Sequence, residues 1–108
     1  MIELPEPIRR YFDASNAHDP DACAACFADD AIVRDERNEH RGVGAVLEWM
    51  RDAITRYGHT VQVLSSAGTG DGVTITGRVS GNFPGSPIVL RHSFVVSGGK
   101  IARLEIAP

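Results

Sequence analysis

The chain has 108 residues, of which 43% are hydrophobic and 23% charged, as is usual for one globular domain. Its formal net charge is −3, and it has no basic stripe or arginine-rich arm, which argues against a nucleic-acid partner. No apolar run is long enough to span a bilayer, and the first residues do not resemble a secretory signal, so no membrane partner is expected. Without a linker or repeat, residues 1–108 are predicted to form one domain in the cytoplasm, with both cysteines as free thiols.

Two helices are predicted at the start of the chain. The first covers about residues 6–18, where Ile8, Tyr11, Phe12 and Ser15 recur at helical spacing. Asp19 followed by Pro20 is typical of a helix start, and a short helix is expected at about 20–27. The residues it is expected to bury are Ala22, Cys23, Cys26 and Phe27.

The first predicted strand, at about 31–36, carries a candidate site residue. Side chains alternate along a strand, so Ala31, Val33 and Asp35 share one face. Asp35 is therefore a carboxylate that points the same way as core residues, where desolvation would raise its pKa. The alternative is a surface ion pair with an arginine at 34, 37 or 41, since a polar loop is expected at 37–42.

The longest amphipathic pattern predicts a helix over residues 43–57, ended by Gly58. On this helix, Trp49 and Met50 are interpreted as core residues that also wall a pocket. Four strands are then predicted, at 60–64, 73–83, 88–97 and 100–106, with glycine- and proline-rich turns between them. Helices followed by a meander favour an α+β fold.

The strand at 88–97 carries a second candidate residue. Its alternation places Leu90, His92 and Phe94 on one face, so His92 lies among apolar neighbours. A histidine there is either a structural core residue or a group that lines a pocket.

Several motifs along the whole chain resemble those of the NTF2-like superfamily, which includes SnoaL-like polyketide cyclases and ketosteroid isomerases. They are Arg10-Tyr11, the segment 16–21, Phe27-Ala28-Asp29-Asp30-Ala31, Arg41-Gly42 and Gly98-Gly99-Lys100-Ile101. The resemblance implies a cone-shaped α+β barrel, in which three N-terminal helices pack on a curved, mostly antiparallel sheet. It also implies a pocket between helices and sheet, and a homodimer formed through the outer face of the sheet.

The resemblance to ketosteroid isomerase also implies roles for individual residues. In that enzyme a helix-one tyrosine stabilises the oxyanion and a first-strand aspartate is the base, and Tyr11 and Asp35 match these positions. The third group of that enzyme, an aspartic acid on a later strand, is replaced here by His92, or by Arg91 if the register shifts by one residue. SnoaL-like cyclases resemble the present arrangement at least as well, since their pockets look like an Asp/His pair that acts on a carbon acid.

Other chemistries have weaker support. The spacing of Cys23 and Cys26 is that of a dithiol, but the pair lies in a predicted helix without a thioredoxin-like strand before it. The four histidines fall on separate elements, so no metal site is expected. The glycine-rich segment 68–72 is predicted to be a hairpin turn, because it lacks the Lys-Ser/Thr step of a phosphate-binding loop.

The sequence therefore predicts a pocket protein that needs no cofactor. Its first hypothesis is proton transfer on a small apolar ligand, an isomerisation or aldol-type cyclisation, with Asp35 as base, His92 as partner acid/base and Tyr11 as oxyanion donor. The expected walls of the pocket are Phe12, Val33, Trp49, Met50, Leu90 and Phe94. The alternatives are a non-catalytic ligand-binding or dimerisation domain, and water activation by Asp35 and His92 on the same scaffold.

Overall fold

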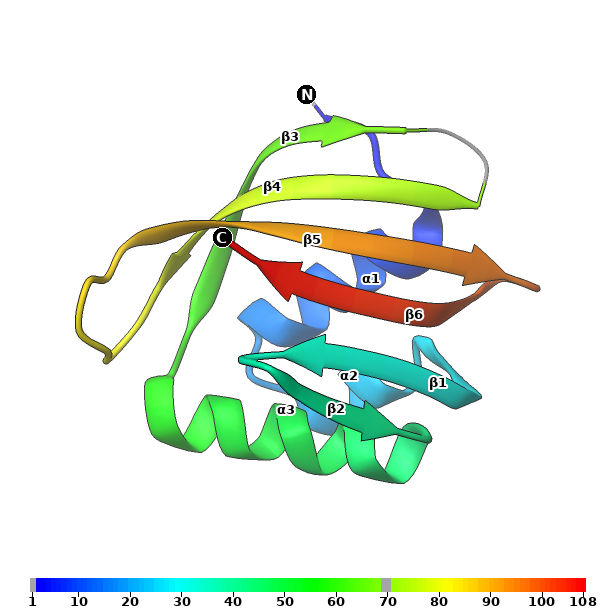
Figure 1. Cartoon of the computed structure of the whole chain (residues 1–108), viewed down its shortest axis with the longest axis horizontal. Helices are drawn as coiled ribbons and strands as arrows, with labels where there is room; N and C mark the ends of the chain where they lie inside the picture. The colour runs from blue at the N-terminus through cyan, green and yellow to red at the C-terminus, as the bar shows by residue number, and fades with distance from the viewer. Residues whose placement is uncertain (1, 69–70) are drawn as a thin grey trace.

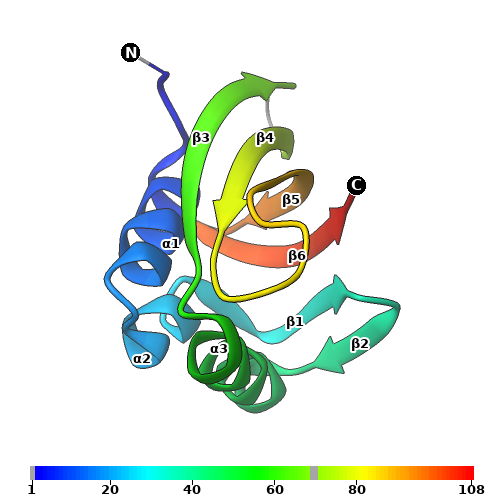
Figure 2. The same ribbon diagram turned by 90° about the vertical axis from the view of Figure 1, so that its left-hand side faces the viewer.

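The computed structural model describes residues 2–68 and 71–108. A six-stranded sheet curves around three helices, which all lie on its concave side (Figures 1 and 2). In chain order, the elements of the described residues are α1 (Glu6–Asn16), α2 (Pro20–Ala24), β1 (Phe27–Asp35), β2 (Asn38–Arg41), α3 (Val43–Tyr57), β3 (Thr60–Ala67), β4 (Gly72–Ser80), β5 (Ile88–Ser97) and β6 (Lys100–Ala107).

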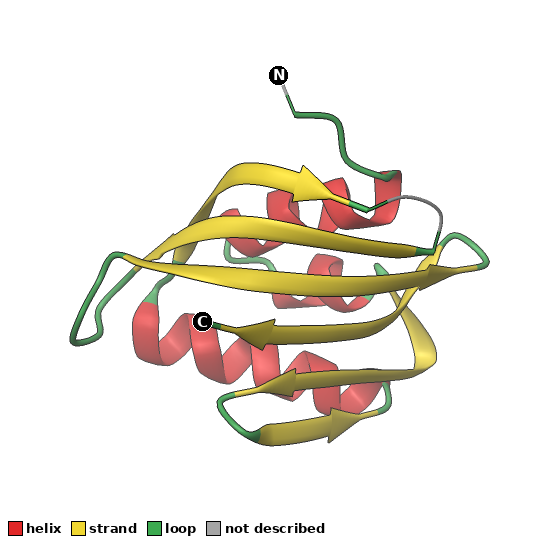
Figure 3. Cartoon of the chain, turned by 45° about the horizontal axis from the view of Figure 1, so that its top comes forward, coloured by secondary structure: helices red, strands yellow, loops and turns green. Residues whose placement is uncertain are grey.

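The strand order in the sheet is β2-β1-β6-β5-β4-β3. Strands β3 to β6 form an antiparallel meander, and β1 joins its last strand in parallel, with Val33 opposite Leu104. The α+β class and the mostly antiparallel sheet are thus confirmed. The order of the elements differs from three leading helices, because the β1–β2 hairpin precedes α3 (Figure 3).

The predicted polar loop at 37–42 was wrong, because residues 38–41 form the strand β2. This strand lies at the edge of the sheet and its side chains are largely exposed, so no apolar alternation marks it. The first strand also begins earlier than predicted, at Phe27, and the exposed pair Asp29-Asp30 lies within it where the register with β6 shifts.

The helices follow their predicted patterns closely. All four residues of the predicted α1 stripe are buried, Asp19 caps α2 by accepting from the Ala22 amide at 3.1 Å, and Gly58 ends α3 with φ of 52°. In the short helix, however, Ala22 is exposed, since α2 ends at Ala24 and turns Cys23 and Ala24 inward instead. Cys26 and Phe27 are buried as predicted but lie beyond the helix.

Strand β5 has the predicted two faces. His92 and Phe94 are buried between the sheet and α1, whereas Arg91 lies on the outer face, where its guanidinium donates to the Pro108 carbonyl at 3.1 Å. The uncertainty between positions 91 and 92 is therefore decided in favour of His92 as the inward residue. Among the described residues, no helix is long and apolar enough to cross a membrane.

Candidate active site

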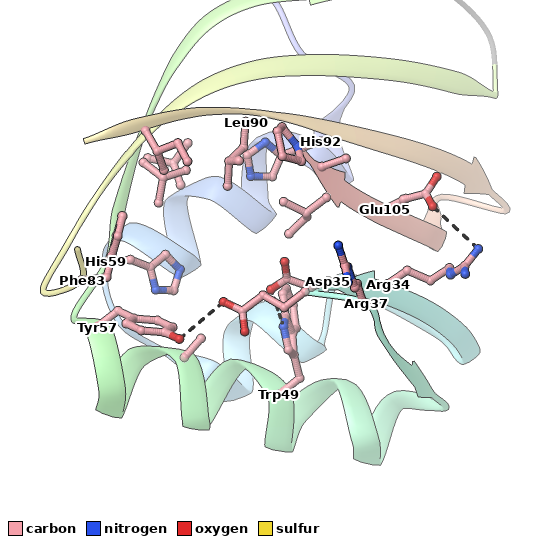
Figure 4. A pocket seen from close by; sticks show the side chains of 18 of the residues that line it. Arg34, Asp35, Arg37, Trp49, Tyr57, His59, Phe83, Leu90, His92 and Glu105 are labelled. Carbon is pink, nitrogen blue, oxygen red and sulfur yellow. Dashed lines mark hydrogen bonds and ion pairs between the residues drawn. The ribbon is translucent and has the colours of Figure 1, made fainter. Parts of the chain in front are cut away.

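A cavity of about 730 Å³ lies between the concave face of the sheet, helix α3 and Tyr11 of α1 (Figure 4). The three residues proposed from the sequence for catalysis, Tyr11, Asp35 and His92, all line it. They come from α1, from the end of β1 and from the middle of β5, so the tertiary structure alone brings them together. The other lining residues are Arg34, Glu36, Arg37, Trp49, Ala53, Tyr57, His59, Val61, Val79, Phe83, Pro84, Ile88, Leu90, Glu105, Ile106, Ala107 and Pro108.

Of the six residues predicted to wall the pocket, Trp49 and Leu90 line the cavity. Phe12, Val33, Met50 and Phe94 lie in the buried core and are not among the lining residues. The prediction that these side chains point inward was correct. It does not distinguish a side chain packed against other side chains from one that faces open space, because both are withdrawn from solvent.

Asp35 is half-buried at the end of β1, and its carboxylate Oδ2 accepts a hydrogen bond of 3.1 Å from the Trp49 indole. Burial raises the pKa of Asp35 and the nearby Glu36 adds to the rise, while the Trp49 hydrogen bond opposes it. None of the arginines at 34, 37 and 41 forms an ion pair with Asp35 within residues 2–68 and 71–108. Arg34 instead contacts Glu39 and Glu105, so the surface ion-pair alternative is not what the structure shows.

Tyr11 is buried in the core, edge-on to the rings of Phe12, Phe27 and Phe94. Burial raises its pKa well above the ordinary value, with smaller contributions from Cys23 and Asp35. The phenol is therefore protonated at neutral pH and is a hydrogen-bond donor. Within the described part of the chain, the structure shows no hydrogen bond from its hydroxyl, which leaves that donor free.

His92 is 3% exposed and packs edge-on against Phe12, with ring centroids 5.5 Å apart. Burial lowers its pKa to about 4, so the imidazole is neutral at pH 7. Nδ1 is buried without a hydrogen-bond partner among the described residues. No hydrogen bond joins His92 to Asp35 there either, although both side chains line the same cavity.

His59, which the sequence analysis did not select, also lines the cavity at the start of β3. Its Nε2 lies 3.2 Å from the Ser15 hydroxyl, and the His18 ring lies 2.8 Å from its backbone carbonyl. Burial lowers its pKa, and His18 lowers it further. The sequence carried no local signal for this residue, because it lies in the short connection after Gly58 and belongs to neither the α3 nor the β3 periodicity.

The comparisons with known proteins agree with this architecture. The SnoaL-like domain family matches residues 8–104. The chain belongs to the SnoaL-like family. The SnoaL-like chain is 44% identical to a protein from Sinorhizobium meliloti called a "putative polyketide cyclase", over 95% of this chain and 94% of that one, with a TM-score of 0.92.

More distant structures share the fold of this SnoaL-like protein. A Catenulispora acidiphila protein with a ketosteroid isomerase-like fold, solved with trimethylamine, is 19% identical over 98% of this chain and 87% of that one, with a TM-score of 0.85. An NTF2-like protein from Cytophaga hutchinsonii is 14% identical over 98% and 89% of the two chains, with a TM-score of 0.81. No curated protein matches the chain significantly. The expected membership of the NTF2-like superfamily is confirmed.

Proposed function

We propose that this SnoaL-like protein catalyses proton transfer on a small, mostly apolar carbonyl compound, in an isomerisation or an aldol-type cyclisation. The observation that carries the proposal is the position of Asp35, a half-buried carboxylate with a raised pKa in the wall of an apolar cavity that Tyr11 and His92 also line. A carboxylate with a raised pKa is a stronger base than an ordinary one, as abstraction of a carbon-bound proton requires.

Each residue has a role in the proposed reaction. Asp35 takes the proton from the carbon next to the carbonyl, and the electron pair of that bond moves onto the carbonyl oxygen. The Tyr11 hydroxyl donates a hydrogen bond to the resulting enolate oxygen, and the neutral His92 ring provides a second polar contact. In an isomerisation the proton returns from Asp35 to another carbon. In a cyclisation the enolate carbon attacks a second carbonyl, and the new alkoxide receives the proton.

The orientation of Asp35 supports this assignment. The Trp49 indole holds Oδ2 from α3, so Oδ1 is the oxygen left for the ligand. Since the indole belongs to a buried side chain of a long helix, the carboxylate is positioned before a ligand arrives. This SnoaL-like chain supplies all these groups from its own side chains, and the proposal includes no cofactor.

Hydrogen–deuterium exchange tests the proposal. The protein is incubated in D2O with enolisable bicyclic ketones such as 2-tetralone and with diketone mimics of polyketides, and loss of the α-proton signal is followed by NMR. We expect exchange above the buffer rate, reduced at least about 100-fold in Asp35→Asn. Asp30→Asn, an exposed change on the same strand, serves as the matched control and keeps the wild-type rate.

Two outcomes would count against catalysis. If the wild type does not exceed the buffer rate with any ketone, the non-catalytic ligand-binding domain becomes the better description. If Asp35→Asn remains fully active, another residue is the base. Urea unfolding of both variants shows whether a loss of exchange reflects chemistry or unfolding. Water activation by Asp35 and His92 would instead appear as hydrolysis or dehydration without α-proton exchange.

We also propose that two copies associate through the outer face of the sheet. Val89 and Val95 are 48% and 41% exposed on the β5 face turned away from the helices. Arg103 lies opposite Val95 and Glu105 opposite Ser93, so this face carries both charges beside the valines and can pair with a copy of itself. Residues 1–108 would then form one cone-shaped domain per subunit, with the cavity on the other side of the sheet.

Sedimentation velocity tests this association. We expect a species with twice the mass of one chain at micromolar concentrations, converted to a monomer by Val95→Glu. Thr55→Glu adds the same charge at an exposed position of α3, on the helix side of the molecule, and shows whether the effect belongs to the outer face of the sheet. A wild-type monomer over the whole concentration range would contradict the proposal. The cytoplasmic location expected from the sequence stays a prediction.

A further inference from the structure

Residues at the end of helix α1 form hydrogen bonds with His59 and Val61, which both line the cavity. The Asn16 amide donates to the Val61 carbonyl at 2.9 Å and accepts from the Val61 amide at 2.7 Å. Ser15 binds the ring of His59 and His18 binds its carbonyl. Four hydrogen bonds from residues 15–18 thus contact this segment, three of them to the backbone of His59 and Val61 and one to the His59 ring.

The backbone on the other side of His59 is also held. The Asn82 amide donates to the Tyr57 carbonyl at 2.8 Å. A Cβ atom at Gly81 would lie 2.8 Å from that same carbonyl and 3.3 Å from the His59 Cα, so only glycine allows the chain to pass this closely. His59 is therefore placed between α1 and the β4–β5 connection, with its ring at the edge of the cavity.

The two ring nitrogens of His59 differ in their hydrogen bonds. Nε2 lies within hydrogen-bond distance of the Ser15 hydroxyl, and Nδ1 is buried without a hydrogen bond among the described residues, although the Ala53 backbone is close enough to the ring to oppose the lowering of its pKa. A buried polar atom without a partner is unfavourable, and such atoms in native structures need an explanation. The torsion about Cβ–Cγ of histidine is broad, so the ring can turn to meet an oxygen in the cavity.

His59 and the proposed catalytic groups occupy different parts of the cavity. In Figure 4, His59 lies beside Tyr57 and Phe83, whereas Asp35 and His92 lie farther along, with the open space between them. On the side of the sheet, the wall between them is apolar and includes Val61, Val79 and Leu90. On the side of α3, Glu36 accepts a hydrogen bond from the Tyr57 hydroxyl at 3.4 Å. A ligand that fills this space would have a polar atom at each end and an apolar body between them.

The charge of the ring narrows the ligand class. Burial and the neighbouring His18 lower the pKa of His59, so the ring is neutral at pH 7. A neutral imidazole favours a neutral hydroxyl or carbonyl oxygen as its partner, while a carboxylate would need a cation. The two arginines that line the cavity, Arg34 and Arg37, lie beside Asp35 and away from His59 (Figure 4).

We propose that His59 is a ligand-contacting residue which binds a hydroxyl or keto oxygen at the end of the ligand opposite its enolisable carbonyl. This inference rests on the cavity of the proposed function and extends it, because it names the substrate class: a neutral, ring-sized carbonyl compound oxygenated at both ends. A hydrocarbon ketone with one oxygen, such as 2-tetralone, then binds less tightly than a ketone of the same size that also has an oxygen at its far end.

A matched pair of fluorescent probes tests the inference. The probes are 2-acetylnaphthalene and 6-acetyl-2-naphthol, which differ only by the hydroxyl at the far end of the ring system. We expect the hydroxylated probe to bind the wild type about 5-fold more tightly, as one neutral hydrogen bond provides. In His59→Phe this preference falls to less than about 2-fold, and in His59→Gln, which keeps a polar side chain, part of it returns.

The control variant is His40→Phe, because His40 lies outside the lining of this cavity and its loss leaves the preference unchanged. Nitrogen-15 NMR of the histidine rings gives a second readout, which holds even if His59→Phe folds poorly. The hydroxylated probe shifts the His59 ring signals of the wild type, and 2-acetylnaphthalene leaves them in place.

The measurements distinguish a failure of this inference from a failure of the catalytic proposal. If both probes bind the wild type equally, or if His59→Phe keeps the preference, this inference is wrong and the catalytic proposal stands. If neither probe binds at millimolar concentration, this inference is overturned together with the ligand cavity that it uses. Loss of α-proton exchange in Asp35→Asn, with the probe preference intact, supports both proposals.

Discussion

At the scale of single residues, burial shifts the pKa values of three ionisable side chains that line the cavity. Desolvation raises the pKa values of Asp35 and Tyr11 and lowers that of His92, so in each case the neutral form gains. The phenol and the imidazole are neutral hydrogen-bonding groups at pH 7. For Asp35, the hydrogen bond from the Trp49 indole opposes the effect of burial on its pKa.

Trp49 is therefore a positioning residue for the proposed base. In Trp49→Phe the hydrogen bond to Oδ2 is lost, and we expect the pKa of Asp35 to rise further, because only the charged form accepts that bond strongly. Stability at pH 7 should fall by roughly 1–3 kcal/mol. Carbon-13 NMR titration of the Asp35 carboxyl measures the first effect and urea unfolding the second.

Tyr57→Phe is the matched control for this prediction. It removes a hydroxyl that donates to the neighbouring Glu36 at 3.4 Å, on the same helix and at the same cavity. We expect the Asp35 titration to stay as in the wild type. An equal shift in both variants would mean that the Trp49 hydrogen bond does not control the carboxylate.

At the scale of elements, the cavity depends on how α1 meets the first strand of the meander. The contact is made through side-chain hydrogen bonds rather than apolar packing alone, since Asn16 pairs with both backbone groups of Val61 as a neighbouring strand would. Without this contact the start of β3 would have unpaired backbone groups next to the cavity.

Asn16→Ala tests this coupling. It removes two hydrogen bonds to the backbone of a buried residue, so we expect a loss of about 2 kcal/mol in the free energy of unfolding, measured in urea. Asn38→Ala removes a single exposed contact of 3.5 Å in the β1–β2 turn and should cost less than about 0.5 kcal/mol. Equal losses in the two variants would show that the pairing with Val61 adds nothing.

At the scale of the whole molecule, burial of the cavity histidines makes stability depend on pH. The pKa of His92 is about 4 in the fold and about 6.5 in the unfolded chain, so between these values only the unfolded chain takes up the proton. The stabilisation is present above pH 6.5 and is lost as pH falls toward 4. Asp35 has the opposite effect on stability. Its pKa is raised in the fold, so protonation at lower pH removes the cost of burying its charge and stabilises the folded state.

We expect the free energy of unfolding to fall by about 2 kcal/mol between pH 7.5 and pH 5 through His92. His92→Gln has no group that titrates in this range and should lose most of that dependence. His40→Gln, at a less buried histidine, should keep it. Urea unfolding at the two pH values measures the difference, and a wild-type slope in His92→Gln would contradict the assignment.

The sequence by itself determined the local structure and the direction of most side chains. Periodicity alone placed α3 and β5 and turned Asp35 and His92 toward the interior, because a side chain's direction follows from φ and ψ and its position in the element. The motifs from Arg10-Tyr11 to Gly98-Gly99-Lys100-Ile101 predicted the superfamily correctly. The edge strand β2 escaped this reasoning, since its exposed side chains carry no apolar pattern.

Only the tertiary structure decided which inward side chains meet open space. Phe12 and Phe94 are as apolar and as inward as Leu90, yet they fill the core while Leu90 lines the cavity. The curvature of the sheet and the position of α3 set that difference, and both arise from contacts between distant segments. His59 shows the same limit: what brings it to the cavity is a set of hydrogen bonds from residues more than forty positions earlier, which no local pattern contains.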